Sequence, residues 1–177
     1  ARVVVIGGGV VGVSTLYHLT KKGWSDVVLL ERTELTSGST WHAAGLLPLF
    51  NMSYTVGQLH KYSVDLYKRL PAETGQDVSF HVTGNLRLAT CRDRMDEYRK
   101  YCGTANTIGV PFQLISPAEV KELWPLVNLG GDADTPAVIG ALYHPDDGHI
   151  APADLTAALR KAARSAGAES NAQTEVT

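Results

Sequence analysis

The chain has 177 residues, of which 44% are hydrophobic and 19% are charged, a balance typical of a globular protein of about one domain. Its formal net charge is −2 and it contains no basic stripe, which argues against nucleic acid as a partner. No apolar run reaches the roughly 18 residues of a membrane span, so no membrane segment is expected. Cys91 and Cys102 lack the CxxC spacing of zinc sites, and the sequence indicates neither a metal site nor a disulfide scaffold.

The chain opens with a strand, a helix and a second strand. Residues 2–6 form a β-branched run without alternation, which predicts a strand buried on both faces of a parallel sheet. A helical pattern covers residues 10–22 and ends at Gly23, and residues 27–30 form a second apolar strand. This order and spacing are those of a βαβ unit.

The remaining sequence predicts a mixed α+β region and then one more helix. Ser116, Pro117 and Glu119 form a strong helix start, with a capping serine, proline at the first position and glutamate three residues after the serine. Pro71 is expected to end the helix before it, and Gly167 the last one. The expected helices span 53–70, 93–107, 117–123 and 152–166, and the expected strands lie within 80–90, at 138–143 and at 171–177.

Gly7, Gly9 and Gly12 form a GxGxxG motif between the first strand and the first helix. In such motifs the first glycine permits a tight turn, the second lets backbone approach a pyrophosphate, and the third lets helix and strand pack closely. The backbone N–H groups of Val10 and Val11 lie at the helix N-terminus, where the helix dipole favours phosphate. The motif therefore predicts a dinucleotide site.

Glu31 ends the second strand, nineteen positions after Gly12. A carboxylate at this place accepts hydrogen bonds from ribose hydroxyls and disfavours a 2′-phosphate. Because both FAD and NAD bind to such a unit, these residues alone do not choose between the two cofactors.

The next segment supplies small and polar residues. Gly38, Ser39 and Thr40 offer N–H and hydroxyl donors to phosphate or ribose oxygens, and the run 43–45 (Ala-Ala-Gly) is small enough for backbone to approach a flat ring. His42 lies between these two groups, and a neutral imidazole nitrogen is a nucleophile. From the residues alone, a structural histidine is the simpler interpretation.

The segment LTSGSTWHAAGL resembles that of dimethylglycine and sarcosine dehydrogenases, within the D-amino-acid-oxidase-like flavoproteins. The segments ETGQ, GNLRLAT, ISPAEVKELWPL and GALYHPDDGHIAPADL follow in the family's order, so the resemblance covers essentially the whole chain. It implies an incomplete flavoenzyme fold of class α/β: a Rossmann-like FAD-binding βαβ unit with an α+β insertion. The expected regions are the βαβ unit and flavin loop at 1–47, the insertion and part of the substrate domain at 48–150, and the return to the FAD-binding domain at 151–177.

The resemblance also implies FAD attached covalently through His42. It implies further FAD contacts from Val10, Val11, Glu31, Arg32, Gly38, Ser39, Thr40, Ala43, Ala44, Gly45 and Leu46. The implied reaction is the oxidative demethylation of sarcosine or dimethylglycine, with hydride passing from the N-methyl carbon to flavin N5. An electron-transfer flavoprotein and tetrahydrofolate are further expected partners of the full-length protein, which would lie in the cytoplasm of a bacterium or the mitochondrial matrix of a eukaryote.

Three other interpretations stay open. A regulatory relative could keep the fold without catalysis, and an NAD-dependent dehydrogenase could use the same glycine motif. His144, Asp146, Asp147 and His149 could suggest a metal site, although Pro145 and Gly148 favour a turn. We expect no catalytic acid or base within this chain, because the family's substrate-binding residues come largely from later segments.

Overall fold

The computed structural model describes residues 1–177, which divide into two compact units. The first unit comprises Ala1–Leu46, Asp65–His81 and His149–Thr177, and the second comprises Leu47–Val64 and Val82–Gly148. Residues 65–81 thus join the unit that holds the glycine motif. None of the helices is long and apolar enough to cross a bilayer.

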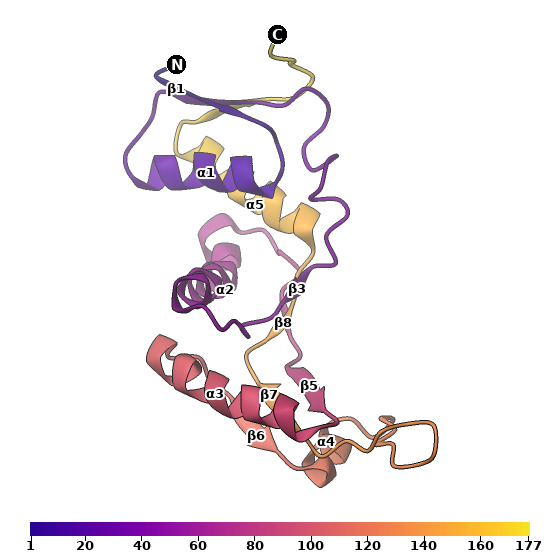
Figure 1. Ribbon diagram of the computed structural model, residues 1–177. Coiled ribbons are helices and arrows are strands. Elements are labelled where there is room, and N and C mark those ends of the chain that lie inside the picture. The colour runs from indigo at the N-terminus through magenta and orange to yellow at the C-terminus, as the bar shows by residue number, and fades with distance from the viewer. The chain divides into compact units, whose positions relative to one another are not determined.

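A parallel sheet, two whole helices and the carboxyl-terminal half of a third helix form the first unit. Its strands β1 (Val3–Ile6), β2 (Val27–Leu30) and β9 (Glu169–Asn171) lie in the order β1-β2-β9. Helices α1 (Val10–Lys21) and α5 (Pro152–Ser165) lie side by side along one face of this sheet (Figure 1). The predicted βαβ unit is confirmed, and the final helix does return to its sheet.

The core of the first unit lies between the sheet and these two helices. Val13, Leu16 and Leu29 are fully buried there, and each such side chain contributes about 1.5–3 kcal/mol by leaving water. The expectation that the first strand is buried on both faces is wrong. Val4 is 50% and Ile6 68% exposed, because the helices cover one face of the sheet and alternate side chains of a strand point to opposite faces.

Helix α2 (Tyr54–Thr74) continues through Pro71, contrary to the prediction that this proline ends it. An interior proline removes one backbone hydrogen bond and costs about 3 kcal/mol. The last turn is nevertheless fixed to α1, because the Glu73 carboxylate accepts from the Tyr17 hydroxyl at 2.8 Å and pairs with Lys21 at 2.9 Å. Contacts distant in sequence therefore override the local stop signal.

The buried side of α2 also differs from the expected one. Leu66 and Leu70 are buried as predicted, whereas Val56 is 37% and Leu59 62% exposed. Val64, at 5% exposure, is buried. The amino-terminal half of this helix belongs to the second unit and its carboxyl-terminal half to the first, so one continuous apolar stripe does not describe it.

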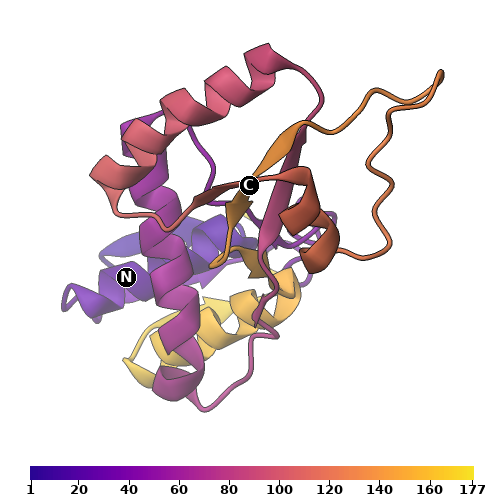
Figure 2. The same ribbon diagram turned by 90° about the horizontal axis from the view of Figure 1, so that it is seen from below.

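An antiparallel sheet, the helices α3 and α4 and the amino-terminal half of α2 form the second unit (Figure 2). Its strands β5, β7 and β6 lie in that order, and Ile115, Val120, Val127 and Ala141 form a buried cluster. The Ser116 side chain accepts from the Glu119 N–H while Glu119 accepts from the Ser116 N–H, which confirms the capping box. The elements are β5 (Asn85–Ala89), α3 (Arg92–Ile108), β6 (Gln113–Ile115), α4 (Pro117–Leu123) and β7 (Gly140–His144).

The chain passes between the two units near three two-residue strands: β3 (Leu46–Leu47), β4 (His81–Val82) and β8 (Gly148–His149).

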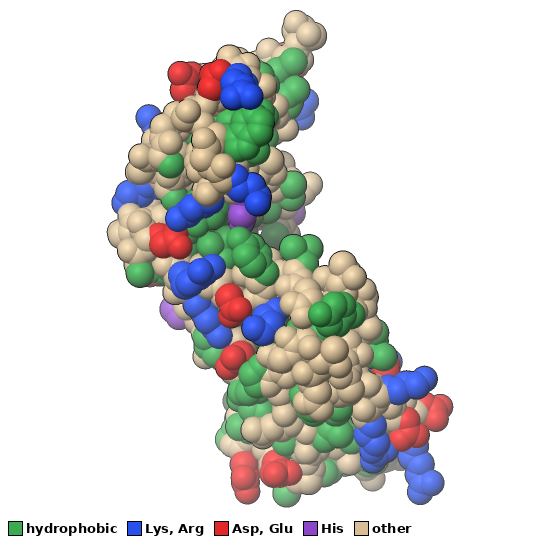
Figure 3. Space-filling model, turned by 90° about the vertical axis from the view of Figure 1, so that its left-hand side faces the viewer, with side chains coloured by type: hydrophobic (Ala, Val, Ile, Leu, Met, Phe, Trp, Pro, Cys, Tyr) green, Lys and Arg blue, Asp and Glu red, His purple; other side chains and the backbone are tan.

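On the face drawn in Figure 3, lysine and arginine side chains are interspersed with aspartate and glutamate.

The prediction of a strand over residues 171–177 is wrong, because β9 ends at Asn171. Gln173 has a φ of 54°, outside the range of a strand. The Gln173 N–H donates to the Thr33 carbonyl at 2.9 Å, and the Thr174 N–H donates to the Glu31 carbonyl at 2.8 Å. These bonds turn the tail over the end of β2 instead of extending the sheet.

Candidate functional site

The glycine motif forms the turn between β1 and α1. Gly7 has a φ of 109°, which an L-side chain rarely adopts, and its N–H donates to the Leu30 carbonyl at 2.8 Å. A Cβ on Gly12 would lie 2.0 Å from the Gly7 carbonyl oxygen, so no side chain fits between helix and turn. The first and third glycines therefore have the tight turn and the close packing that the motif predicts.

The N-terminus of α1 carries no acidic residue and no side-chain cap from its own N-cap residue, Gly9. The Val10 N–H donates to the Thr40 hydroxyl at 2.9 Å, and no protein group accepts from the Val11 N–H. Thr40 is 7% exposed, and its own hydroxyl proton remains available as a donor. Helix dipole, free N–H and hydroxyl together favour an anion at this place.

Glu31 is bonded at both carboxylate oxygens. Oε2 accepts from the Gly8 N–H at 2.6 Å, and Oε1 accepts from the N–H and the hydroxyl of Thr33 at 2.8 and 3.0 Å. The bonds from the Thr33 and Gly8 backbone lower the pKa of Glu31 below its ordinary 4.5. Since a carboxylate offers about four lone-pair sites, the ionised group retains acceptor capacity for a hydroxyl.

The segment after Glu31 folds back onto the glycine turn through successive turns. The Thr36 N–H donates to the Gly8 carbonyl at 3.1 Å, and the Trp41 N–H donates to the Thr36 carbonyl at 3.0 Å. The His42 N–H donates to the Ser39 carbonyl at 3.2 Å, and the His42 side chain is exposed. The loop therefore stands beside the N-terminus of α1, with an accessible imidazole.

The small residues at the end of this loop have different environments. Ala43 and Ala44 are exposed, and Leu46 is 67% exposed. Gly45 has a φ of 72°, and a Cβ there would lie 2.1 Å from the Ile150 carbonyl oxygen. Glycine is thus required at position 45 by the backbone of Ile150, a reason that the sequence did not indicate.

A hollow of about 280 Å³ adjoins the glycine turn. Three of the residues expected to contact FAD line it: Gly7, Glu31 and Arg32. The carboxyl-terminal tail closes its other side, which sequence reasoning missed because the tail was expected to be a strand. The lining residues are Ile6, Gly7, Leu30, Glu31, Arg32, Thr174, Glu175 and Val176.

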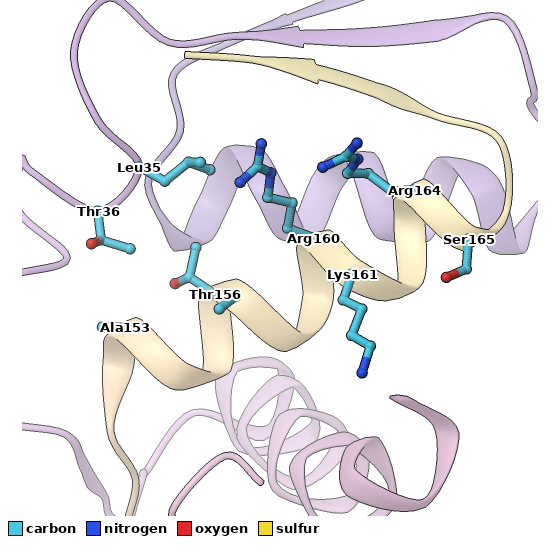
Figure 4. A pocket seen from close by; sticks show the side chains of 9 residues that line it. Leu35, Thr36, Ala153, Thr156, Arg160, Lys161, Arg164 and Ser165 are labelled. Atoms are coloured by element: carbon cyan, nitrogen blue, oxygen red, sulfur yellow. The ribbon is translucent and has the colours of Figure 1, made fainter. Parts of the chain in front are cut away.

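A second hollow of about 420 Å³ runs along α5 (Figure 4). Arg160 and Arg164 point to the same side of that helix, whereas Lys161 points away from them (Figure 4). The Arg160 guanidinium donates through Nε to the Ser170 hydroxyl at 2.7 Å. This side chain therefore fastens α5 to β9, and none of the predicted site residues lines this hollow.

The polar residues between His144 and His149, which could suggest a metal site, differ in their exposure to solvent. His144 and Asp147 are 0% and 1% exposed, whereas His149 is exposed. No three histidine, cysteine or acidic side chains meet as a metal-binding group. The Thr83 and Gly84 N–H groups donate to the Asp147 carbonyl, so this run forms a bonded turn.

The sequence of this chain matches the family described as FAD dependent oxidoreductase over residues 2–177. The chain belongs to this family. Membership selects FAD over NAD as the cofactor of the βαβ unit. The residues present fit that group, since the glycine turn leaves no side chain in the way of a pyrophosphate and the α1 N-terminus offers free donors.

Three curated proteins are similar to nearly all of this chain. Dimethylglycine dehydrogenase of Rattus norvegicus is 47% identical over 167 residues, and sarcosine dehydrogenase of Homo sapiens is 42% identical over 170 residues. The pyruvate dehydrogenase phosphatase regulatory subunit of Mus musculus is 38% identical over 176 residues. These matches cover 94%, 96% and 99% of this chain, but only 19%, 18% and 19% of the three relatives.

Among solved structures, L-proline dehydrogenase from P. horikoshii superposes with a TM-score of 0.88 at 33% identity. The match covers 99% of this chain and 44% of that chain. The fold described above is therefore that of part of an FAD-dependent oxidoreductase.

Replacing Glu31 with glutamine should weaken FAD binding about tenfold or more, because an amide N–H₂ would face the donors of Gly8 or Thr33. The dissociation constant is measured by titrating full-length apoprotein with FAD, with and without Glu31→Gln. Because the pKa of Glu31 lies below 4.5, the carboxylate stays ionised, and its contribution is lost only as pH falls through that lowered pKa. Equal affinity of the two proteins would contradict the role given to Glu31.

Proposed function

We propose that the full-length protein is a flavoenzyme that oxidatively demethylates an N-methylated glycine, sarcosine or dimethylglycine. One observation carries the proposal: the loop of His42 is bonded to the glycine turn through Thr36 and Thr40, beside the α1 N-terminus. A dinucleotide whose phosphates lie at that N-terminus would extend along this loop. The dehydrogenases of dimethylglycine and sarcosine, at 47% and 42% identity, support this substrate class.

In the proposal the pyrophosphate lies at Gly7, Gly9 and Gly12, and the Val10–Val11 backbone and Thr40 face it. Glu31 accepts from the adenosine ribose, and Arg32 and Gly38–Leu46 contact the rest of the cofactor. When bound, the flavin accepts hydride at N5 from the N-methyl carbon of the substrate. Hydride loss would leave an iminium, and water would add to its carbon so that the C–N bond breaks and formaldehyde and the demethylated amine leave; alternatively the carbon would pass to tetrahydrofolate. An electron-transfer flavoprotein is the proposed acceptor of the electrons.

His42 is the proposed point of covalent attachment, through the 8-methyl group of the flavin. A ring nitrogen of its exposed imidazole would bond the carbon of that methyl group; the ring N–H and one methyl C–H would break, and dioxygen would take up the two electrons and two protons as hydrogen peroxide. The bond would retain the cofactor during turnover. The side chain has no partner within the chain that would have to be broken first.

The test of this function is anaerobic reduction of purified full-length protein. Sarcosine or dimethylglycine should bleach the visible flavin band, whereas glycine, which has no N-methyl carbon, should not. Yellow protein that neither N-methylated amino acid bleaches would overturn the substrate class while leaving the cofactor in place.

A second candidate is a regulatory protein that keeps the fold without catalysis. The 38% identity to the regulatory subunit of Mus musculus favours it, because that similarity covers 99% of this chain. Folded but colourless full-length protein would support this candidate against the enzyme.

A further inference from the structure

The backbone of Glu31 is held by the chain that follows β9. The Glu31 N–H donates to the Asn171 carbonyl at 2.9 Å, and the Glu31 carbonyl accepts from the Thr174 N–H at 2.8 Å. Residues 171–174 thus bend over the end of β2 and bond both backbone groups of Glu31. The carboxylate of Glu31 extends from this backbone to the Gly8 N–H, so its position depends on where that bend lies.

Strand β9 has no apolar side chain that could hold it in place. Its residues are Glu169, Ser170 and Asn171, of which the first and last are exposed and the middle one is half-buried. The strand lies at the edge of the sheet and pairs only with β2. Since apolar burial is the main force that holds a strand in a fold, the position of β9 depends on its polar contacts.

Helix α5 supplies such contacts through Arg160. Its Nε donates to the Ser170 hydroxyl at 2.7 Å, and its Nη2 donates to the Ser170 carbonyl at 3.5 Å. A charged donor forms a stronger hydrogen bond than a neutral one. The helix is itself fixed by packing, because Leu159 and Ala163 are buried. The guanidinium therefore joins the middle residue of β9 to a well-packed helix.

We propose that Arg160 is a positioning residue for the adenosine end of FAD. Through Ser170 it holds β9, and through β9 it holds the bend of residues 171–174 that fixes the Glu31 backbone. The inference rests on the proposed contact between Glu31 and the adenosine ribose. All of these residues belong to the first unit, and each step from Arg160 to Glu31 is a hydrogen bond or a direct continuation of the chain.

The experiment titrates full-length apoprotein with FAD under anaerobic conditions, so that binding stays reversible without the dioxygen that the proposed attachment consumes. Arg160→Ala should raise the dissociation constant about fivefold, less than the roughly tenfold of Glu31→Gln, because the lost hydrogen bond acts on Glu31 only through β9. Ser170→Ala is a milder change that keeps the bond to the backbone carbonyl, and it should raise the dissociation constant about threefold.

Coupling to Glu31 separates positioning from a general loss of stability. In protein that already carries Glu31→Gln, Arg160→Ala should change the dissociation constant by less than about twofold, because the carboxylate that Arg160 positions is gone. Hydrogen exchange at the Glu31 and Thr174 amides needs no cofactor. It should accelerate in Arg160→Ala and in Ser170→Ala, since both amides bond within the segment that β9 holds.

Arg164→Ala is the matched control. Arg164 lies one turn further along α5 and points to the same side as Arg160 (Figure 4), but it makes no bond to β9. This variant loses the same charge and the same side chain, and it should bind FAD like the wild type. Equal weakening by Arg160→Ala and Arg164→Ala, or full additivity of Arg160→Ala with Glu31→Gln, would overturn the proposal.

Failure of the proposed function gives a different result. Wild-type apoprotein that did not bind FAD would refute the cofactor site, and the positioning role with it. Wild-type protein that bound FAD, together with unchanged affinity or unchanged exchange at Glu31 and Thr174 in Arg160→Ala, would refute the role of Arg160 alone.

Discussion

Replacing His42 with alanine should release the flavin of the full-length protein into the supernatant on acid precipitation, whereas the wild-type flavin stays with the precipitate. The covalent bond needs an imidazole nitrogen, which alanine lacks. The fold should survive, because the His42 side chain is exposed and bonds no other group of the chain. An exposed substitution of this kind changes the free energy of unfolding by no more than about 0.5 kcal/mol.

His60→Ala is the control for that experiment, since His60 lies in α2 outside the flavin loop. This variant should keep its flavin through acid precipitation. Acid-stable flavin on the His42→Ala protein would show that another residue carries the bond.

Replacing Gly12 with alanine should nearly abolish FAD loading. The new methyl group would lie 2.0 Å from the Gly7 carbonyl oxygen, and both partners of this clash are backbone. The turn between β1 and α1 must open to relieve it, which moves the free N–H groups away from a pyrophosphate. Overpacking of this kind costs about 1–3 kcal/mol of unfolding free energy. The ratio of flavin to protein absorbance and the melting temperature measure the two effects.

Gly103→Ala is the control, because it makes the same chemical change at a position with room for the added methyl group. Gly103 lies inside α3, and a Cβ there meets no atom within 4 Å. Alanine should raise the unfolding free energy by about 0.5–1 kcal/mol, because glycine is the poorer helix former, and flavin loading should not change. If Gly12→Ala loaded flavin as well as Gly103→Ala, the glycine turn would not be the pyrophosphate site.

The parts of the fold that were predicted correctly from the sequence are those that depend on residues close together in the chain. The βαβ unit follows from two short apolar runs around a glycine turn, and the start of α4 follows from Ser116 and Glu119. Gly7, Gly12 and Glu31 were expected near one another because the motif itself sets their spacing. Arg32 was expected there only from the resemblance to the flavoprotein family.

The parts that sequence missed depend on contacts distant along the chain. Pro71 lies inside α2 because Glu73 bonds to α1, fifty-six positions from Tyr17. The tail leaves the sheet at Asn171 because its N–H groups bond Thr33 and Glu31. No local sequence pattern indicates these distant bonding partners. The end of α2 at Pro71 and the strand over residues 171–177 were therefore both predicted wrongly.

The candidate site shows the same division. Thr40 was expected to face phosphate or ribose, but its bond to Val10 spans thirty positions and appears only in the folded chain. The bond from the Leu49 N–H to the Asp147 carboxylate was not predicted for the same reason, since the two residues are ninety-eight positions apart. The sequence did show His144 and Asp147 within a polar run, but no local pattern indicated that these two side chains would be buried.

The most direct measurement is mass spectrometry of a tryptic digest of the full-length protein. Cleavage after Arg32 and Lys61 yields one peptide that contains both His42 and His60, so fragmentation must assign the modified residue. We predict a flavin adduct located on His42. A peptide 33–61 without added mass from protein that retains flavin through acid precipitation, or an adduct located on His60, would contradict the account.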